Sequence, residues 1–442
     1  MRKPVRPGIK ERISALFGSE RFCDAAKNTL IAVLVLSASL LLVRLGMFSF
    51  KGSGPTSAQG GQGASQQTAQ GSGTLRAAGP YTIVVTGESG SHCALMYDGT
   101  ELKQAYDRLS AYLGEALGSA GDPESVSEKE WYAALKKSGV YFNFVYSQPL
   151  SVIASSLGTT MTSTSLNHSA ARFCIAAEGD DVALYYLRGR DGRYYKCATA
   201  ISSAALKPKL GDWSSNGASF LFETDYNYDL VDSCFTVIEG QAQIHGVTAQ
   251  NPIGGDYDKA GLAGVFGMNS YMANHYTEDD GTEVYVEGAR ILRVYTDGRV
   301  SFKNSAEPAE AQESETGFAA ALSTAEKAVS ATVGAHGGIA STVLTYIGYD
   351  AEASSYTVRF EYEINNCPVI TGAVGAAQFT VSGGVITAGE LYFRKYAYSG
   401  EDDSPLPAVQ AMAVVQASGG GTPFLGYVDD GDNVLAGWTI LN

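Results

Sequence analysis

The sequence predicts an α+β protein outside a single N-terminal transmembrane helix, with antiparallel meander sheets packed against helices. Three observations predict this class. One long apolar run occurs near the N-terminus, short segments with alternating apolar residues turn on Asp-Gly or Gly-Asp pairs, and other segments repeat apolar residues every three or four positions. Alternation is typical of half-buried strands, and the longer repeat is typical of amphipathic helices.

The apolar run spans Thr29 to Phe50 and would form a helix about 33 Å long, enough for a hydrocarbon core of about 30 Å. Seven Lys and Arg residues precede it against three Asp and Glu, so residues 1–28 are expected to be a basic cytoplasmic segment. The rest of the chain is then extracytoplasmic at the cell membrane. A cleaved signal peptide is the alternative, but no small-residue cleavage site follows Phe50 closely.

Residues 51–80 are rich in Gly, Ser, Gln and Ala and predict a flexible linker with an r.m.s. reach of about 30 Å. Beyond residue 51 the chain has 22 Lys and Arg against 43 Asp and Glu, a net charge of −21. This charge argues against nucleic acid as a partner. Five cysteines in this part, with no repeated spacing, do not indicate a disulfide framework.

Residues 81–210 predict a first α+β lobe. A strand is expected at Tyr81–Val85, and Leu102, Leu109 and Leu113 recur on one face of a helix from about Thr100 to Leu117. The later expected elements are a helix with a Ser127/Glu130 capping box that stops at Gly139, a strand at Val140–Tyr146, and a short helix from Pro149 to Gly158.

A three-strand meander follows over residues 171–200, with turns at Gly179-Asp180 and Asp191-Gly192. Two-residue turns would place Cys174 opposite Tyr185 and Cys197 opposite Tyr186. Because adjacent residues of the central strand point to opposite faces, the two sulfur atoms should lie on opposite faces of the sheet. We therefore expect no disulfide between them.

Residues 211–305 predict a β-rich middle lobe, and residues 306–442 a C-terminal α+β lobe. In the middle lobe we expect strands at 218–226 and 234–240, a helix near Leu262 to Met268, and a meander at 283–302 that turns on Asp297-Gly298. The C-terminal lobe predicts a helix capped by Thr316 and stopped by Gly334, four strands, a helix after Pro407 at Ala408–Ala417, and a last strand at 435–441.

Catalytic and metal-binding signatures are missing from the sequence. The five histidines have no metal-ligand spacing, and there is no C-x-x-C, G-x-S-x-G or S-x-x-K motif. We predict a protein that is not an enzyme and has no cofactor. Arg188, Arg190 and Arg193 form a basic hairpin that could meet a partner or an anionic wall polymer, or could simply balance Asp180, Asp181 and Asp191.

Several segments of the chain together resemble the YycH-type regulators of two-component systems in Gram-positive bacteria. They are KNTLIAVLVLSASLLLVRLGMF (27–48), ALYYLRGRDGRYYKCATA (183–200), GVFGMNSYMANHYTEDDGTEVYVEGARILRVYTDGRVSF (264–302) and ITAGELYFRKY (386–396). The resemblance implies one membrane helix, an extracytoplasmic α+β ectodomain and a partner that is a sensor histidine kinase of the cell envelope. It also allows a paralogous regulator as a second partner, and it carries no active-site motif.

The hypothesis that follows is a membrane-anchored regulator whose transmembrane helix contacts a kinase helix while the ectodomain modulates the kinase. The expected helix contacts are Leu30, Leu34, Leu36, Leu40, Leu41 and Arg44. The alternative is an envelope protein that binds a cell-wall polymer through exposed tyrosines and the Arg188/Arg193 hairpin. The long linker argues against rigid coupling between the anchor and the ectodomain.

Overall fold

The computed structural model describes residues 78–96, 100–240, 242–254, 257–306, 313–372 and 374–440. The cytoplasmic segment and the anchor expected at 1–50 lie outside these ranges, as does the linker up to residue 77. Across the described ranges, every helix is too short or too polar to cross a membrane. The fold is α+β, as the sequence predicts, and consists mainly of antiparallel sheets with few helices.

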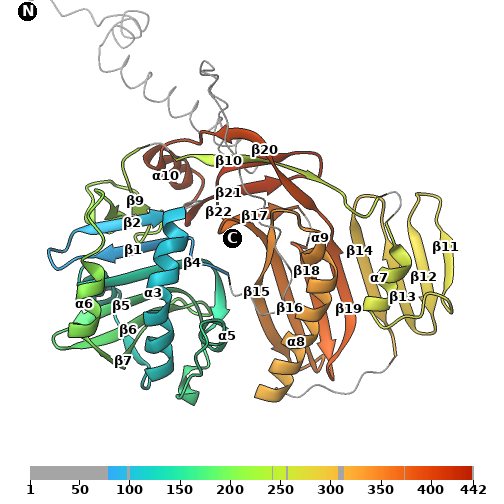
Figure 1. The fold of residues 1–442 in the computed structure, drawn as a ribbon, viewed down its shortest axis with the longest axis horizontal. Helices are drawn as coiled ribbons and strands as arrows, with labels where there is room; N and C mark the ends of the chain where they lie inside the picture. Colours follow the sequence, from blue (N-terminus) through green and yellow to red (C-terminus); the bar gives the residue numbers. More distant parts are fainter. Residues whose placement is uncertain are drawn as a thin grey trace, which may run out of the picture.

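The N-terminal lobe is built around a seven-stranded antiparallel sheet in the order β2-β1-β4-β5-β6-β7-β3 (Figure 1). Its strands are β1 (Thr82–Thr86), β2 (His92–Met96), β3 (Glu124–Val126), β4 (Gly139–Pro149), β5 (Ser169–Glu178), β6 (Asp181–Arg188) and β7 (Tyr194–Ser202). Its helices are α3 (Thr100–Ser119), α4 (Glu128–Leu135), α5 (Leu150–Ser156), the 3₁₀ turn η1 (Thr164–Leu166) and α6 (Ser203–Leu210). Helices α3, α5 and α6 cover one face, and α4 with residues 218–234 covers the other.

The capping-box signal in this lobe is confirmed, whereas the expected stop at Gly139 is not. The Ser127 hydroxyl accepts from the Glu130 amide, and the Glu130 carboxylate accepts from the Ser127 amide, which completes the capping box. The helix ends at Leu135, with Lys136 as its C-cap, so the prediction that Gly139 stops it was wrong. Gly139 instead begins β4, where a Cβ atom would lie 2.2 Å from the carbonyl oxygen of Ile175. Close strand pairing is the reason for glycine here.

The meander confirms that Cys174 and Cys197 lie on opposite faces, although one register differs from the prediction. Cys174 pairs with Tyr185, but Cys197 pairs with Leu184, because the loop between β6 and β7 is longer than two residues. Cys174 packs in the cluster beneath α4, and Cys197 packs in the cluster beneath α3. The sheet therefore separates the two thiols.

Residues 211–250 connect the two lobes. The strands expected at 218–226 and 234–240 shrink to a small hairpin, β8 (Ser219–Phe220) and β9 (Thr236–Val237), with a 3₁₀ turn η2 (Leu221–Glu223). The chain then crosses as β10 (Ile244–Gln250), which pairs with β20 (Lys395–Asp403) at the top of the molecule in Figure 1. Phe220 is fully buried against the N-terminal lobe, so burial of that side chain fixes the hairpin.

The C-terminal lobe has an eleven-stranded sheet in the order β11-β12-β13-β14-β19-β18-β16-β17-β21-β22, with β15 also paired to β16. The strands are β11 (Asn274–Thr277), β12 (Glu283–Glu287), β13 (Arg290–Val294), β14 (Arg299–Asn304), β15 (Ser341–Asp350), β16 (Ser355–Ile364), β17 (Cys367–Thr371), β18 (Ala377–Ser382), β19 (Val385–Tyr392), β21 (Pro423–Asp429) and β22 (Val434–Ile440). Because β14 pairs with β19, strands from the expected middle and C-terminal lobes share this sheet. The boundary at residue 305 stays a prediction.

The helices of this lobe are α7 (Lys259–Val265), α8 (Glu315–Ala331), α9 (Val333–His336) and α10 (Ala408–Ala417). Helix α10 has the bounds that Pro407 predicts. Ser314, rather than Thr316, caps α8, because the helix begins one residue before Thr316 and the Ser314 hydroxyl accepts from the Gly317 amide at 3.0 Å. The prediction that Gly334 stops the helix was also wrong. Helix α8 ends at Ala331, and its C-cap Thr332 has a non-helical backbone and a hydroxyl that donates to the Ala328 carbonyl.

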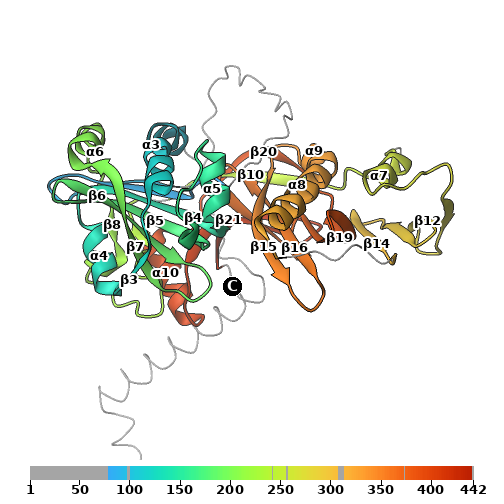
Figure 2. The same ribbon diagram turned by 90° about the horizontal axis from the view of Figure 1, so that it is seen from below.

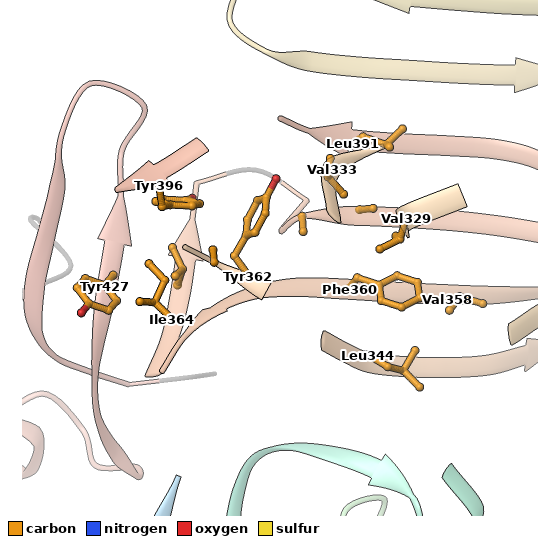
Figure 3. Close-up of a cluster of buried hydrophobic side chains, with 14 of the residues drawn as sticks. Val329, Val333, Leu344, Val358, Phe360, Tyr362, Ile364, Leu391, Tyr396 and Tyr427 are labelled. Carbon is orange, nitrogen blue, oxygen red and sulfur yellow. The ribbon is translucent and has the colours of Figure 1, made fainter. Parts of the chain in front are cut away.

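The core of the C-terminal lobe lies between α8 and the sheet. Figure 3 shows Val329 and Val333 from the helices above Phe360 and Tyr362 of β16, with Leu391 of β19 beside them. Figure 2 shows α8 and α9 lying on one side of the strands, while α7 covers the far end of the sheet. The alternating apolar residues of β16 thus meet the apolar stripe of α8.

A buried ion pair joins Arg394, the residue before β20, to Asp429, the last residue of β21. Arg394 donates from Nε and Nη2 to the two carboxylate oxygens of Asp429 at 2.7 and 2.8 Å. The Tyr396 hydroxyl and the Gly431 amide also donate to Asp429, each at 2.9 Å. The side chains of Arg394 and Asp429 are 4% and 0% exposed. Removing either member of such a pair is strongly destabilising, because the other member keeps a buried charge without a partner.

We therefore expect Asp429→Ala to lower the free energy of unfolding by about 3–5 kcal/mol, because Arg394 would keep a buried charge without its partner. Urea unfolding followed by circular dichroism measures the change. Asp212→Ala is the matched control, since Asp212 pairs with Arg108 at the surface and should cost less than about 1 kcal/mol. Equal losses in the two variants would contradict the expectation.

Candidate functional site at the interlobe seam

The chain enters the fold between the two lobes. We call residues 78–81 the entry strap, because they connect the expected linker to β1. The Ala78 amide donates to Gln148 Oε1 at 3.2 Å, and the Tyr81 amide donates to the Asn143 carbonyl at 2.7 Å. Both acceptors belong to β4 of the N-terminal lobe. Ala78, Tyr81 and Gln148 are all buried.

The strap also binds the C-terminal lobe, through Pro80 and Tyr81. The Leu425 amide of β21 donates to the Tyr81 hydroxyl at 2.5 Å, and the Asn366 side chain donates to the Pro80 carbonyl at 3.0 Å. The Tyr81 ring packs edge-on against Phe424, with ring centroids 5.3 Å apart. The strap therefore contacts both lobes through main-chain and side-chain groups.

The contact between the strap and the neighbouring turn depends on glycine at position 79 and on asparagine at positions 365 and 366. A Cβ atom on Gly79 would lie 2.8 Å from Asn366 Oδ1, so glycine allows the strap to pass close to the turn. The turn residues Asn365 and Asn366 have φ of 50° and 64°, a region that asparagine tolerates better than most residues. The Asn365-Asn366 turn thus positions one of the donors to the strap.

A second polar contact joins the lobes beside the strap. Arg172 of β5 forms a two-pronged ion pair with Asp232, and both side chains bond to the hydroxyl of Thr422, which precedes β21. The Arg172 and Asp232 side chains are 14% and 13% exposed. Burial disfavours the guanidinium charge, but Asp232, Tyr141 and Cys234 together outweigh burial and raise the pKa of Arg172. The Arg172 guanidinium therefore stays charged, and the pair links three distant segments.

We call the surface along which the two lobes meet the seam. Carboxyl groups gather on its C-terminal side, where β4 packs against β15. Burial raises the pKa of Glu361 on β16 to about 7. Burial, and then the charges of Glu361 and Glu363, raise the pKa of Tyr146 of β4 well above its ordinary value. The seam is thus a place where protonation near neutral pH changes the charge between the lobes.

The basic hairpin expected from the sequence is present, but one of its three arginine side chains, Arg188, is engaged within the protein. Arg188 forms a two-pronged ion pair with Asp191, lies over the Tyr195 ring and contacts His168 Nε2 at 3.1 Å. The bond from Arg188 lowers the pKa of Asp191 to about 2. Arg190 is exposed, and the Arg193 side chain is 67% exposed although it also lies 3.4 Å from Asp191. The hairpin therefore offers two guanidinium groups to solvent.

One arrangement that sequence reasoning missed is a buried Thr86, His92 and Glu223 cluster. The His92 ring bonds to the Thr86 hydroxyl and to the Glu223 carboxylate, each at 2.9 Å, and Lys136 lies 3.6 Å from Glu223. Thr86 and His92 are 2% and 5% exposed, so a substrate cannot reach the hydroxyl. The cluster fixes the η2 turn to β1 and β2.

Within the described ranges, no group of three His, Cys, Asp or Glu side chains could hold a metal ion.

Comparison with known proteins shows the fold. No family model matches the sequence, and a search of curated proteins finds no significant match. Among solved structures, the chain is similar to the crystal structure of YycH from Bacillus subtilis, with a TM-score of 0.53 and 11% sequence identity. The match covers 81% of this chain and 95% of that chain. The chain therefore has a YycH-like fold at low sequence identity, consistent with the resemblance in the sequence.

Replacing Tyr81 with Phe should weaken the seam, because the Leu425 amide would lose its acceptor in a buried place. A buried donor without a partner costs about 1–3 kcal/mol, so the free energy of unfolding should fall by that amount. Chemical denaturation measures it. Tyr226→Phe is the matched control, since that ring is 45% exposed, and a loss as large as that of Tyr81→Phe would contradict the seam's importance.

Glu361→Gln should alter the pH dependence of stability. A carboxyl group with a raised pKa contributes stability that is fully present below about pH 4.5 and is lost as the pH rises through about 7. The variant should therefore match the wild type at pH 4 and exceed its stability at pH 8, by up to about 3 kcal/mol. Unfolding curves at both pH values measure this, with Glu390→Gln, an exposed residue of the same sheet, as control. An equal difference at both pH values would refute it.

Proposed function

We propose that this protein is a membrane-anchored extracytoplasmic regulator of a sensor histidine kinase of the cell envelope, and that it has no enzymatic activity. The observation that carries the proposal is the YycH-like fold, because the likeness covers 95% of the YycH chain and 81% of this chain rather than one module. The sequence resemblance to YycH-type regulators supports the same function. The buried histidine cluster offers no accessible nucleophile that would favour an enzyme.

In this proposal the apolar segment at 29–50 both anchors the chain and contacts the kinase. Leu30, Leu34, Leu36, Leu40, Leu41 and Arg44 are the proposed contacts. The linker expected at 51–80 ends in the entry strap, which binds both lobes. A change in the relative position of the lobes can therefore affect the kinase by two routes. One is through the strap and linker to the membrane helix, and the other is direct contact of the ectodomain with the kinase. The long linker favours direct contact.

A second candidate function is binding to an anionic wall polymer. The observation that favours it is the pair of exposed guanidinium groups, Arg190 and Arg193, on a hairpin held rigid by the Arg188 ion pair. Guanidinium groups are suited to phosphate and carboxylate oxygens. Retention of the protein on teichoic acid, with loss of retention in an Arg190→Ser/Arg193→Ser variant, would favour this candidate over the regulator.

Photocrosslinking in cells tests the regulator directly. A photoreactive residue at Leu36 or Leu40 should give a covalent product with a sensor histidine kinase, identified by mass spectrometry, because both residues lie on one face of the expected helix. Val35 is the matched control, since it lies about 100° or more around the helix from every proposed contact and should give much less product.

Products with lipid alone from all three positions would contradict the proposed helix contact. In that case, unchanged envelope-stress transcription after deletion of the gene would contradict the regulator as a whole.

A further inference from the structure

The outer edge of the large sheet is exposed at strand β11. This strand pairs with β12 on one side, and the sheet order ends there. All four residues, Asn274 to Thr277, are exposed. Figure 1 shows β11 as the outermost strand of an arm that lies far from the N-terminal lobe. On its outer side, no strand from the described part of the chain pairs with it.

An edge strand presents a row of backbone N–H and C=O groups that another strand can pair with. Proteins usually protect such edges by keeping the strand short, or with proline, with lysine or with a bulge. Strand β11 is short, but its sequence Asn-His-Tyr-Thr has no proline or lysine and it pairs with β12 in an unbroken register. Its inner side is held firmly, because the His275 ring stacks on Tyr285 with centroids 4.4 Å apart. The edge is therefore regular and open to pairing.

Two apolar side chains stand at the N-terminal end of this edge. Tyr271 is 97% exposed and Met272 is 73% exposed, the highest values among the large apolar side chains of the described ranges. They lie on an ordered turn, because Asn269 accepts from the amides of Tyr271 and Met272 at 3.1 and 2.9 Å. Tyrosine and methionine on an ordered backbone turn are suited to a protein contact, since little loop entropy remains to be lost on binding.

Acidic residues stand at the other end of the edge. The turn after β11 contains Glu278, Asp279 and Asp280. Glu278 lies 3.6 Å from Arg293, and Asp280 accepts from the Thr282 amide, so part of this charge is engaged within the protein. Asp279 is exposed. The edge thus runs from an apolar end to an acidic end over one short strand.

We propose that the β11 edge receives an extended strand of a partner protein, with apolar residues that meet Tyr271 and Met272 and with Lys or Arg that meets the 278–280 turn. Backbone hydrogen bonds would supply affinity, and the two ends would set the register and direction. The inference deepens the proposed function by naming a partner surface of the ectodomain. It rests on that function for the partner's identity, but the strand contact itself can be tested alone.

A second copy of the chain fits this edge poorly. Antiparallel pairing of two β11 strands would place the acidic turn of each copy against Tyr271 and Met272 of the other. Parallel pairing would place the two acidic turns together. The extracytoplasmic part also has a net charge of −21, which opposes self-association. The charge distribution therefore favours a partner with basic residues.

The test uses the purified full-length chain in detergent and a display library of random 12-residue peptides. Selected peptides should combine alternating apolar residues with Lys or Arg near one end. A selected peptide should slow hydrogen exchange of the backbone amides of Asn274 to Thr277. Its affinity should fall at least tenfold in Tyr271→Ser/Met272→Ser and severalfold in Asp279→Lys.

The matched control is Tyr226→Ser/Leu230→Ser, which removes an exposed tyrosine and an exposed aliphatic residue from another surface. Its affinity for the peptide should equal that of the wild type. Peptides that bind both double variants equally, or that leave the exchange of the β11 amides unchanged, would overturn the proposal. Concentration-dependent dimers that the Tyr271→Ser/Met272→Ser change abolishes would also overturn it in favour of a second copy. None of these outcomes depends on the kinase.

Discussion

The placement of Tyr81 between two sheets is the constraint on which the relative position of the lobes depends. Its amide is bonded to β4 of one lobe, its hydroxyl to β21 of the other, and its ring packs on Phe424. Displacing one lobe from the other must break at least one of these buried contacts. Since unpaired buried polar groups are costly, the two sheets are held as one unit at this point.

The interior polar groups lie mainly where distant segments of the chain meet. Arg172 and Asp232 join β5 to the connecting segment and to Thr422, and Arg394 with Asp429 joins β20 to β21. An ion pair of this kind adds little net stability compared with apolar packing, but it tolerates few alternative geometries. We regard the Arg172–Asp232 pair as an element that selects one arrangement of the lobes, and the Arg394–Asp429 pair as one that selects one packing of strands within the C-terminal lobe.

Much of the fold could be predicted from the sequence where the signal is local. The capping box at Ser127, the Asp297-Gly298 turn and the helix after Pro407 each depend on residues within a few positions of one another. The alternating pattern also identified most strands of the two meanders. Errors of cap and stop position at Thr316, Gly334 and Gly139 arose because hydroxyl and glycine residues also serve strand pairing and helix interiors.

The candidate site was not predictable in the same way. The parallel pairing of β17 with β21 and the crossing of β10 to β20 join segments separated by more than fifty residues, and no local pattern specifies them. The entry strap was expected to be the end of a flexible linker because its composition is Ala-Gly-Pro. Its order comes from partners on both lobes. Nothing in the sequence linked Asn366 to Pro80.

The most direct test of this account is the distribution of distances between the lobes. Spin labels at Lys209→Cys in α6 and Val385→Cys in β19, in a Cys23→Ser background, allow pulsed electron paramagnetic resonance to measure it. The account predicts one narrow distribution for the otherwise native chain and a clearly broader one for Tyr81→Ala with unchanged secondary structure. A broad distribution before the Tyr81 change, or an unchanged narrow one after it, would contradict the claim that the strap holds the lobes together.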